Sequence, residues 1–176
     1  KMPGSYDEKF SSLRLLYLYM YAHPGKKLLF MGGEFGQFIE WNHHQGLDWH
    51  LLEYEMHNKM QNFVRDLNKL YKYEKALWEL DFDQAGFEWI DCNDADRSII
   101  SFSRKDTEGN ELVFVCNFTP VVYGDYRVGV HNLGYYREVL NSDSEIYGGS
   151  NVGNNGGVTA EQIGVQGKEN SLKIVV

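Results

Sequence analysis

Several side chains that could take part in chemistry lie close together between residues 34 and 49. Glu34 follows two glycines and a short apolar run, which is where α/β folds place functional groups at the carboxyl end of a buried strand. Trp41 and Trp49 enclose a polar stretch that ends with Asp48. Two such tryptophans could stack on the apolar face of a hydroxyl-rimmed ligand such as a sugar, or could simply anchor the loop by packing. Glu34, Trp41, Asp48 and Trp49 are therefore the candidate substrate-binding residues.

Other kinds of site find little support in the sequence. His43, His44 and His50 lack the i, i+4 spacing and the accompanying carboxylate of a metal-binding helix, so we expect no metal site. The glycine-rich turn at residues 32–36 does not have the three-glycine nucleotide pattern, and no phosphate loop or Ser-His-Asp spelling occurs. We therefore expect no cofactor, and no nucleophile with a neighbouring base can be assembled.

The elements around these residues follow the order helix, strand, helix. Ser5 and Glu8 have capping-box spacing, and Pro24-Gly25 ends the helix that they begin. Residues 28–31 are apolar at every position, which predicts a parallel strand covered on both faces. Two apolar stripes at helical spacing mark the two helices: Phe10, Leu13, Leu16, Tyr17, Met20 and Tyr21, then Leu52, Met56, Met60, Phe63, Val64, Leu67, Leu70 and Tyr71. This order is typical of an α/β barrel or a doubly wound sheet, but the segment is too short to be either alone.

From about residue 82 the apolar pattern changes to a period of two, which predicts several short antiparallel strands and a β-sandwich. The expected strands include Phe87 and Trp89, residues 99–103, 112–116, 126–130, 135–140 and 171–176. We expect Trp89 to lie in the sandwich core rather than to form a glucan platform. Cys92 and Cys116 have no partner at metal-binding spacing, so we expect both to be buried thiols.

Composition supports a globular protein built from two different segments. The chain has 176 residues, of which 43% are hydrophobic and 15% aromatic, and this excludes a disordered chain. The net charge of −8 argues against nucleic-acid binding, and no apolar run approaches the ~20 residues of a membrane helix. Residues 1–80 carry 10 acidic and 10 basic side chains, whereas residues 81–176 carry 15 and 7. The shift predicts a boundary near residue 80.

Eight short stretches, in the same order along nearly the whole chain, resemble the bacterial 1,4-α-glucan (glycogen) branching enzymes of the α-amylase superfamily. The run from Glu40 to Leu52 is the most family-specific, whereas the turn at residues 33–36 alone would indicate only an amylase-like barrel. The stretches are residues 1–4, 27–37, 40–43, 47–52, 81–83, 86–91, 115–120 and 140–143.

This resemblance implies an α+β fragment. Residues 1–80 would be the last helix-strand-helix part of a (β/α)8 barrel, with its eighth strand at 27–31, and residues 81–176 an antiparallel β-sandwich C-terminal domain without its final strand. Such enzymes cleave an α-1,4 bond and pass the chain to a 6-hydroxyl, using one carboxylate as nucleophile, one as acid/base and a third that stabilises the charged sugar. The resemblance places all three carboxylates before Lys1, so this fragment would contain no catalytic residue and be inactive alone.

The implied partners are α-1,4-glucan or glycogen and the rest of the barrel, without nucleic acid or membrane, and the implied location is cytoplasmic. Two alternatives remain open at this point. A related α-glucan hydrolase would use water as acceptor, although the run from Glu40 to Leu52 argues against it. A non-catalytic glucan-binding or structural module would belong to a different class; clustered exposed aromatics on the sandwich would favour binding, and inward-pointing Trp89 and Phe114 would favour a structural role.

Overall fold

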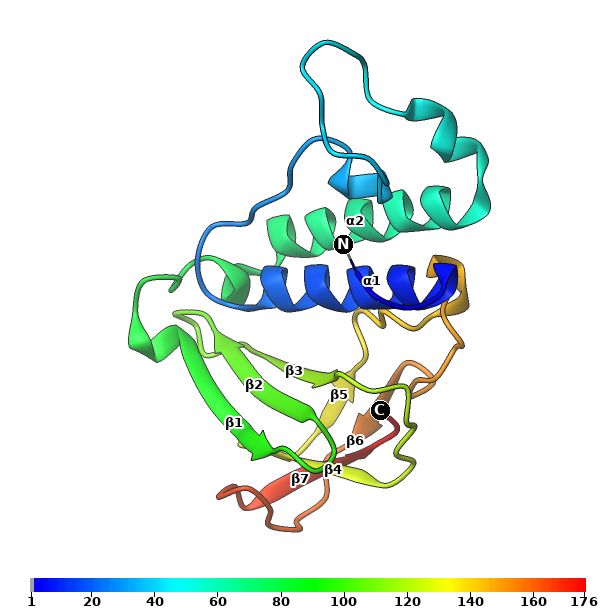
Figure 1. The fold of residues 1–176 in the computed structure, drawn as a ribbon. Helices are drawn as coiled ribbons and strands as arrows, with labels where there is room; N and C mark the ends of the chain where they lie inside the picture. The colour runs from blue at the N-terminus through cyan, green and yellow to red at the C-terminus, as the bar shows by residue number, and fades with distance from the viewer. Residues whose placement is uncertain (1) are drawn as a thin grey trace.

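A computed structural model describes residues 2–176, so Lys1, which begins the first family-like stretch and the predicted barrel segment, lies outside the described residues. Two helices form a layer that covers one side of a β-rich carboxy-terminal half (Figure 1). The elements, in chain order, are α1 (Tyr6–Ala22), α2 (Glu55–Tyr73), β1 (Phe87–Asp94), β2 (Ile99–Lys105), β3 (Glu111–Asn117), β4 (Tyr126–Val130), β5 (Tyr135–Arg137), β6 (Gly157–Thr159) and β7 (Asn170–Ile174).

Helix α1 begins where the sequence predicts, because the signal is local. The Glu8 amide donates to Ser5 Oγ over 3.3 Å, and the Ser5 amide donates to Glu8 Oε2 over 2.6 Å, which completes the capping box. The helix ends at Ala22, just before Pro24. Helix α2 lies alongside α1 (Figure 1), and the two share a core of Phe10, Tyr17, Tyr21, Met60, Phe63, Val64 and Leu67.

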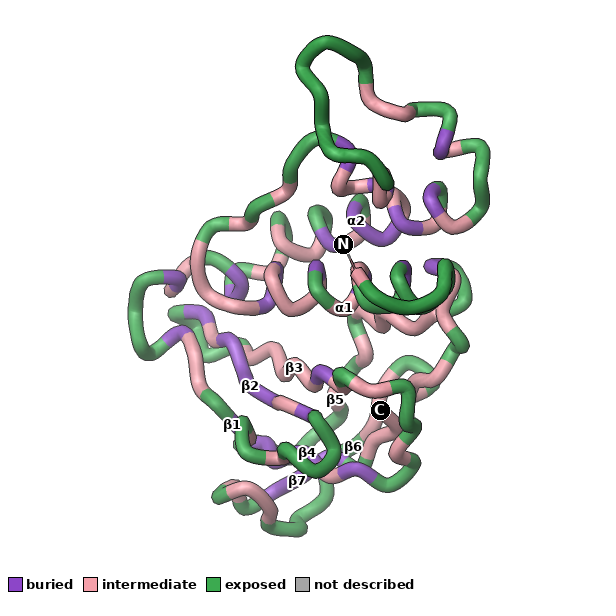
Figure 2. Tube along the Cα trace, in the orientation of Figure 1, coloured by how far each residue is buried: buried purple, intermediate pink, exposed green. Residues whose placement is uncertain are grey.

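The predicted buried strand at residues 28–31 is absent, and this prediction is wrong for the described chain. Residues 26–30 have no helical or strand structure, and the tube in this segment is coloured as exposed or intermediate (Figure 2). Leu28 and Phe30 are 80% and 65% exposed. A parallel strand needs neighbours that take up its backbone hydrogen bonds and cover its two faces. No strand among residues 2–176 pairs with this segment, so Leu28, Phe30 and Met31 remain exposed, while Leu29 packs against the core between the helices.

The β-rich half contains antiparallel sheets, as the period-two pattern predicts. Strands β1, β2 and β3 form one sheet in that order, β4 pairs with β7, and β5 pairs with β6. The strand expected at 135–140 is shorter, and the last strand is shifted by one residue at its start. Strand β6 begins at Gly157, at the end of a stretch rich in glycine and asparagine, residues 148–157.

Strand β2 lies between two cores because its side chains alternate. Phe102 is fully buried on the face toward α1, where it packs with Ala22 and Cys116. Ile99, on the opposite face, belongs to the core that joins this sheet to β4 and β7, with Ile90, Tyr126, Val128, Val130, Ala160 and Leu172. The helical layer and the second sheet thus cover opposite faces of the first sheet.

Two further predictions from the sequence are wrong, and both concern strand β1. Trp89 is 41% exposed rather than core, because β1 is an edge strand; the aromatic rings near its indole are those of Phe87, Phe102 and His23, at 5.0, 5.6 and 6.2 Å. Cys92 is exposed, since the register of β1 against β2 shifts after Asp91 and turns the thiol outward. Cys116 is buried, as predicted.

Two buried arginines join the helical layer to the β-rich half. The Arg104 guanidinium on β2 donates to Asp81 Oδ1 over 2.7 Å, to the Ala22 carbonyl at the end of α1 over 2.8 Å, and to the Gly86 carbonyl over 3.1 Å. Arg14 on α1 donates to the carbonyls of Ser142 and Tyr147 over 2.7 and 3.1 Å. Charged side chains this deeply buried are stable only when they are paired and hydrogen-bonded, so the middle and the C-terminal end of α1 are held against the β-rich half.

Candidate functional site

The turn that carries Glu34 is held by both helices. A short 3-10 segment, Gly33–Phe35, lies between Gly32 and Gly36, whose φ angles of 83° and 69° favour glycine. Phe35 is fully buried, and its carbonyl accepts a hydrogen bond from Nδ1 of His57 on α2 over 2.7 Å. The Tyr17 hydroxyl on α1 donates to the Gly33 carbonyl over 2.9 Å. Contacts from both helices therefore hold the turn that carries Glu34 in place, although the segment before the turn is not a strand.

Glu34 lies on the side of this turn that faces α2. Its side chain is half-buried and borders a shallow cavity of about 410 Å³, whose lining includes Arg65, Lys69 and Lys72. Burial, together with the nearby Glu34 carboxylate, raises the pKa of Tyr17 to about 12. The Tyr17 hydroxyl is consequently a hydrogen-bond donor throughout the neutral range and keeps its bond to the turn.

The polar loop after the turn is closed at its base by one glutamine. The amide of Asp48 donates to Gln37 Oε1 over 2.9 Å, which joins the two ends of the loop. Beyond this closure the loop projects from the helical layer (Figure 1). Trp49 packs on Phe35, with ring centroids 5.2 Å apart, and leaves 53% of its surface exposed. A hydrogen-bonded base with an exposed indole beside it suits a ligand-contacting loop.

The four candidate residues do not meet in one pocket. Asp48 and Trp49 lie beside the turn, whereas Glu34 borders the cavity on α2, which none of the other three lines. Trp41 packs edge-on against Phe30 at 5.6 Å and is 42% exposed. Because Phe30 belongs to the segment without strand partners, the place of Trp41 depends on a region that lacks neighbours in the described chain.

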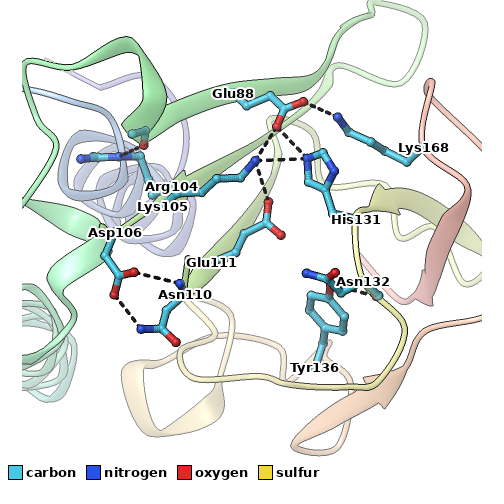
Figure 3. A network of polar contacts seen from close by, with 11 residues as sticks. Glu88, Arg104, Lys105, Asp106, Asn110, Glu111, His131, Asn132, Tyr136 and Lys168 are labelled. Carbon is cyan, nitrogen blue, oxygen red and sulfur yellow. Dashed lines mark hydrogen bonds and ion pairs between the residues drawn. The ribbon is translucent and has the colours of Figure 1, made fainter. Parts of the chain in front are cut away.

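A second polar group, at one end of the β-rich half, comes closest to a metal site. Within residues 2–176, the one set of three metal-ligating side chains whose ligand atoms all lie within 4.8 Å is Glu88, Glu111 and His131. The Lys105 ammonium lies among them, at 2.8 Å from Glu88, 3.8 Å from Glu111 and 3.1 Å from His131 Nε2 (Figure 3). A lysine therefore occupies the position that a cation would take, and the arrangement is an ion-pair network.

The carboxylate of Glu88 is the centre of this network. Burial raises the pKa of Glu88, but hydrogen bonds from Lys105, Lys168 and His131 outweigh that effect and lower it to about 2. Glu88 lies on β1 and Lys105 on β2. Lys168 lies in the loop before β7, and His131 directly follows β4 (Figure 3). The network therefore connects the sheet of β1, β2 and β3 to the sheet of β4 and β7.

Sequence reasoning missed the residues that position the turn and join the two halves. The residue types and spacing around His57, Arg104 and Asp81 do not distinguish these positions from those of solvent-exposed polar residues. One usable signal existed for His57, which sits one residue after Met56 and three before Met60 on the apolar stripe of α2. A polar side chain at the border of an apolar helical face is expected to have a buried hydrogen-bond partner.

The β-rich half matches a known family. Residues 89–176 match the model of the alpha amylase C-terminal all-beta domain, which is half of the chain and contains all the sheets except the start of β1. The chain belongs to this family. The match agrees with the antiparallel sheets described above.

Several curated proteins are similar to the chain over most of its length, and all are named 1,4-alpha-glucan branching enzyme GlgB. The protein from Aquifex aeolicus is 56% identical over 177 residues, covering all of this chain and 28% of the relative. The protein from Halothermothrix orenii is 61% identical over 85% of this chain and 24% of the relative. The protein from Gloeobacter violaceus is 53% identical over 98% of this chain and 24% of the relative. These relatives confirm the resemblance, and this chain spans about a quarter of their length.

Helices α1 and α2 are the long helices among residues 2–176. Neither has a stretch apolar enough to cross a membrane.

Proposed function

We propose that the chain is the C-terminal part of a cytoplasmic glycogen branching enzyme, which cleaves an α-1,4-glucan and transfers the released chain to a 6-hydroxyl. The observation that carries the proposal is 56% identity across the whole chain to an enzyme of that name. Residues 1–80 would complete the catalytic barrel, and residues 81–176 would form the C-terminal domain. The three carboxylates of this retaining chemistry would come from the preceding part of the enzyme, so the chain alone is inactive.

The exposed apolar segment at residues 28–31 supports the barrel assignment. Four consecutive apolar side chains between a helix and a double glycine are a stable arrangement only when both faces of the segment are covered. Neighbouring barrel strands would cover them and take up the free backbone groups. Under this proposal Leu28 and Phe30, which are the most exposed of the segment, become buried in the whole enzyme.

The loop from Glu34 to Trp49 would then lie at the catalytic mouth of the barrel. Barrel enzymes carry their sites on the loops that follow the strands, and this loop follows residues 28–31 directly. Trp41 and Trp49 are exposed indoles that can stack on the apolar face of a glucose ring, and Asp48 and Glu34 can accept hydrogen bonds from its hydroxyls. Packing of Phe30 into the barrel would fix the position of Trp41.

The β-rich half would act as a structural partner of the barrel. Arg104 and Arg14 hold the C-terminal end and the middle of α1 against it through buried hydrogen bonds, so loss of either part removes partners from a buried arginine of the other. Removing residues 82–176 from the whole enzyme should lead to aggregation or a markedly lower melting temperature. A truncated enzyme that stayed equally stable and only lost affinity for long glucans would contradict this role.

A chimera tests the proposed activity. This chain would replace the matching 177 residues of the Aquifex aeolicus relative, and the product would be incubated with amylose. We expect new α-1,6 branches, measured by chain release with a debranching enzyme, and no rise in reducing ends. The 176-residue chain alone is the control and should produce neither. A folded chimera that only raised reducing ends would support a hydrolase, and a folded chimera without activity would contradict the proposal.

The exposure of Trp89 favours a second candidate function, a glucan contact on the β-rich half. The indole lies on a three-stranded sheet, braced by Phe87 and Phe102, with nearly half of its surface free. If this is so, glycogen in a native gel should retard the Trp89→Ala variant of the active chimera less than it retards the parent chimera. In gels without glycogen the two proteins should migrate equally. Equal retardation of both proteins would leave Trp89 as a packing residue.

A further inference from the structure

A tight turn before strand β6 contains the one Asn-Gly pair in the sequence, Asn155-Gly156. Asn155 and Gly156 have φ angles of 51° and 93°, and the amide of Gly157 donates to the Asn154 carbonyl over 3.0 Å. Two successive residues with positive φ closed by this bond form a type I′ turn. Both central residues of the turn are exposed.

The reactive groups of this pair are free of partners. Among residues 2–176, neither the side-chain amide of Asn155 nor the backbone N–H of Gly156 makes a hydrogen bond. Gly156 is exposed, and a Cβ placed on it would meet no atom within 4 Å, so the turn is open around this residue. The preceding Asn154 differs sharply, because its side chain donates to Glu138 and to the Val175 carbonyl, and accepts from the Val175 amide.

We propose that Asn155 is a site of spontaneous deamidation and isoaspartate formation. The Gly156 nitrogen loses its proton and attacks Cγ of Asn155, a new C–N bond forms, and the side-chain nitrogen leaves as ammonia with that proton. The resulting cyclic imide takes up one water molecule. Opening at one carbonyl gives aspartate, and opening at the other gives isoaspartate, in which the main chain runs through the former side chain. No oxidant, metal or enzyme is needed.

Hydrogen bonds connect the turn to neighbouring strands, so isoaspartate at Asn155 would disturb those strands. The Gly156 carbonyl accepts hydrogen bonds from the Glu138 amide and from the Tyr135 hydroxyl, each over 3.0 Å. Asn154 joins the turn to Val175, just after β7. Isoaspartate adds one methylene to the main chain inside this connection, so it should loosen β6 and the end of β7, whereas ordinary aspartate keeps the chain length.

The chain supplies its own comparison sites at two Asn-Ser pairs. The Asn141 side chain donates to the Val152 carbonyl over 2.7 Å and accepts from the Asp143 amide over 2.9 Å. Asn170 is buried in β7, and its side chain donates to the His131 carbonyl over 3.0 Å. Serine is also a small following residue, but these held side chains cannot turn toward the next amide nitrogen. Asn141 and Asn170 should therefore remain unchanged under conditions that convert Asn155.

The experiment is an incubation of the folded 176-residue chain at neutral and mildly alkaline pH. Proteolytic peptides would be examined by mass spectrometry for the mass gain of amide-to-acid conversion, and isoaspartate by enzymatic methylation. We expect conversion at Asn155, faster at the higher pH, and about tenfold slower than in a free peptide of residues 148–162 because the backbone ordering of about one residue must be lost. Asn155→Gly, which suits the positive φ, should abolish the methylation signal.

The stability of the products gives a second readout. The isoaspartate form should unfold at lower urea concentration than the parent, whereas Asn155→Asp should unfold close to it. An Asn155 that stays intact in the folded chain while the free peptide converts would overturn the proposal. Conversion at Asn141 and Asn170 as fast as at Asn155 would overturn it as well, because the free groups of the turn would then confer no selectivity.

Discussion

The buried arginine that joins the two halves offers the strongest test of the structure. Arg104 is completely buried, and its guanidinium donates to Asp81 and to two backbone carbonyls over 2.7 to 3.1 Å. Replacing it by methionine keeps much of the side-chain volume but leaves the Asp81 carboxylate and both carbonyls without these partners. Breaking a buried pair from one side costs about 3–5 kcal/mol of the free energy of unfolding. For a chain of this size that corresponds to a melting temperature lower by about 6–20 °C.

The assay is urea unfolding followed by tryptophan fluorescence and by circular dichroism. Arg97→Met is the matched control, since Arg97 pairs with Asp94 at 3.1 Å on the surface and exposed pairs contribute little. Arg104→Lys keeps the charge but cannot form the same three-way fork, so it should fall between Arg104→Met and the parent. The double variant Arg104→Met with Asp81→Leu should recover part of the loss, because no unpaired charge remains buried.

An Arg104→Met protein as stable as the Arg97→Met protein would refute the reasoning. Failure of Arg104→Met to fold, with Arg97→Met folded, would agree with the reasoning. The loss of unfolding free energy would then be measured on Arg104→Lys. The outcome also bears on the proposed role of the β-rich half, since this arginine connects that half to the end of α1.

Three further predictions address the network, the loop and the thiols. The pKa of Glu88 is lowered from 4.5 to about 2, so its stabilising contribution is present above pH 4.5 and is lost as the pH falls toward 2; Glu88→Gln should make urea unfolding less dependent on pH in that window. In the chimera, Trp41→Ala should lower turnover on amylose at least tenfold and the melting temperature by little, because the indole is partly exposed and its ring neighbours, Phe30 and His43, are exposed too. Cys92 should react with a thiol reagent in the folded chain, whereas Cys116, whose pKa burial raises to about 12, should react only after unfolding.

Each of these has an outcome that contradicts it. An unchanged pH profile in Glu88→Gln would mean that the network contributes nothing to stability at low pH. Loss of Trp41→Ala activity in proportion to loss of folded protein would make the indole a packing residue. Two thiols reacting at equal rates without denaturant would place Cys116 at the surface.

The sequence by itself determined the helices and strands whose defining patterns span only a few residues. The capping box of Ser5 and Glu8 needs only contacts three residues apart, so the start of α1 could be predicted and is found. The period-two pattern likewise identified β2 and β4, and a short continuous apolar run identified β3, because both signals lie within the strand itself. Resemblance of short stretches identified the family, since those stretches keep their residue types and order.

Tertiary structure decided everything that depends on distant partners. Trp89 lies in a predicted strand at an alternating position, and Cys92 lies in the same strand, but the edge position of β1 and its register shifts put both at the surface. Arg104 and Asp81 are 23 residues apart, and nothing in their spacing predicts that they meet. The candidate loop shows the same division: the sequence located Glu34 and Trp49, whereas the hydrogen bond from His57 that holds their turn required α2 to pack against it. Residues 28–31 have the composition of a buried strand, yet a strand exists only where a neighbour takes up its backbone hydrogen bonds, and the described chain has none for them.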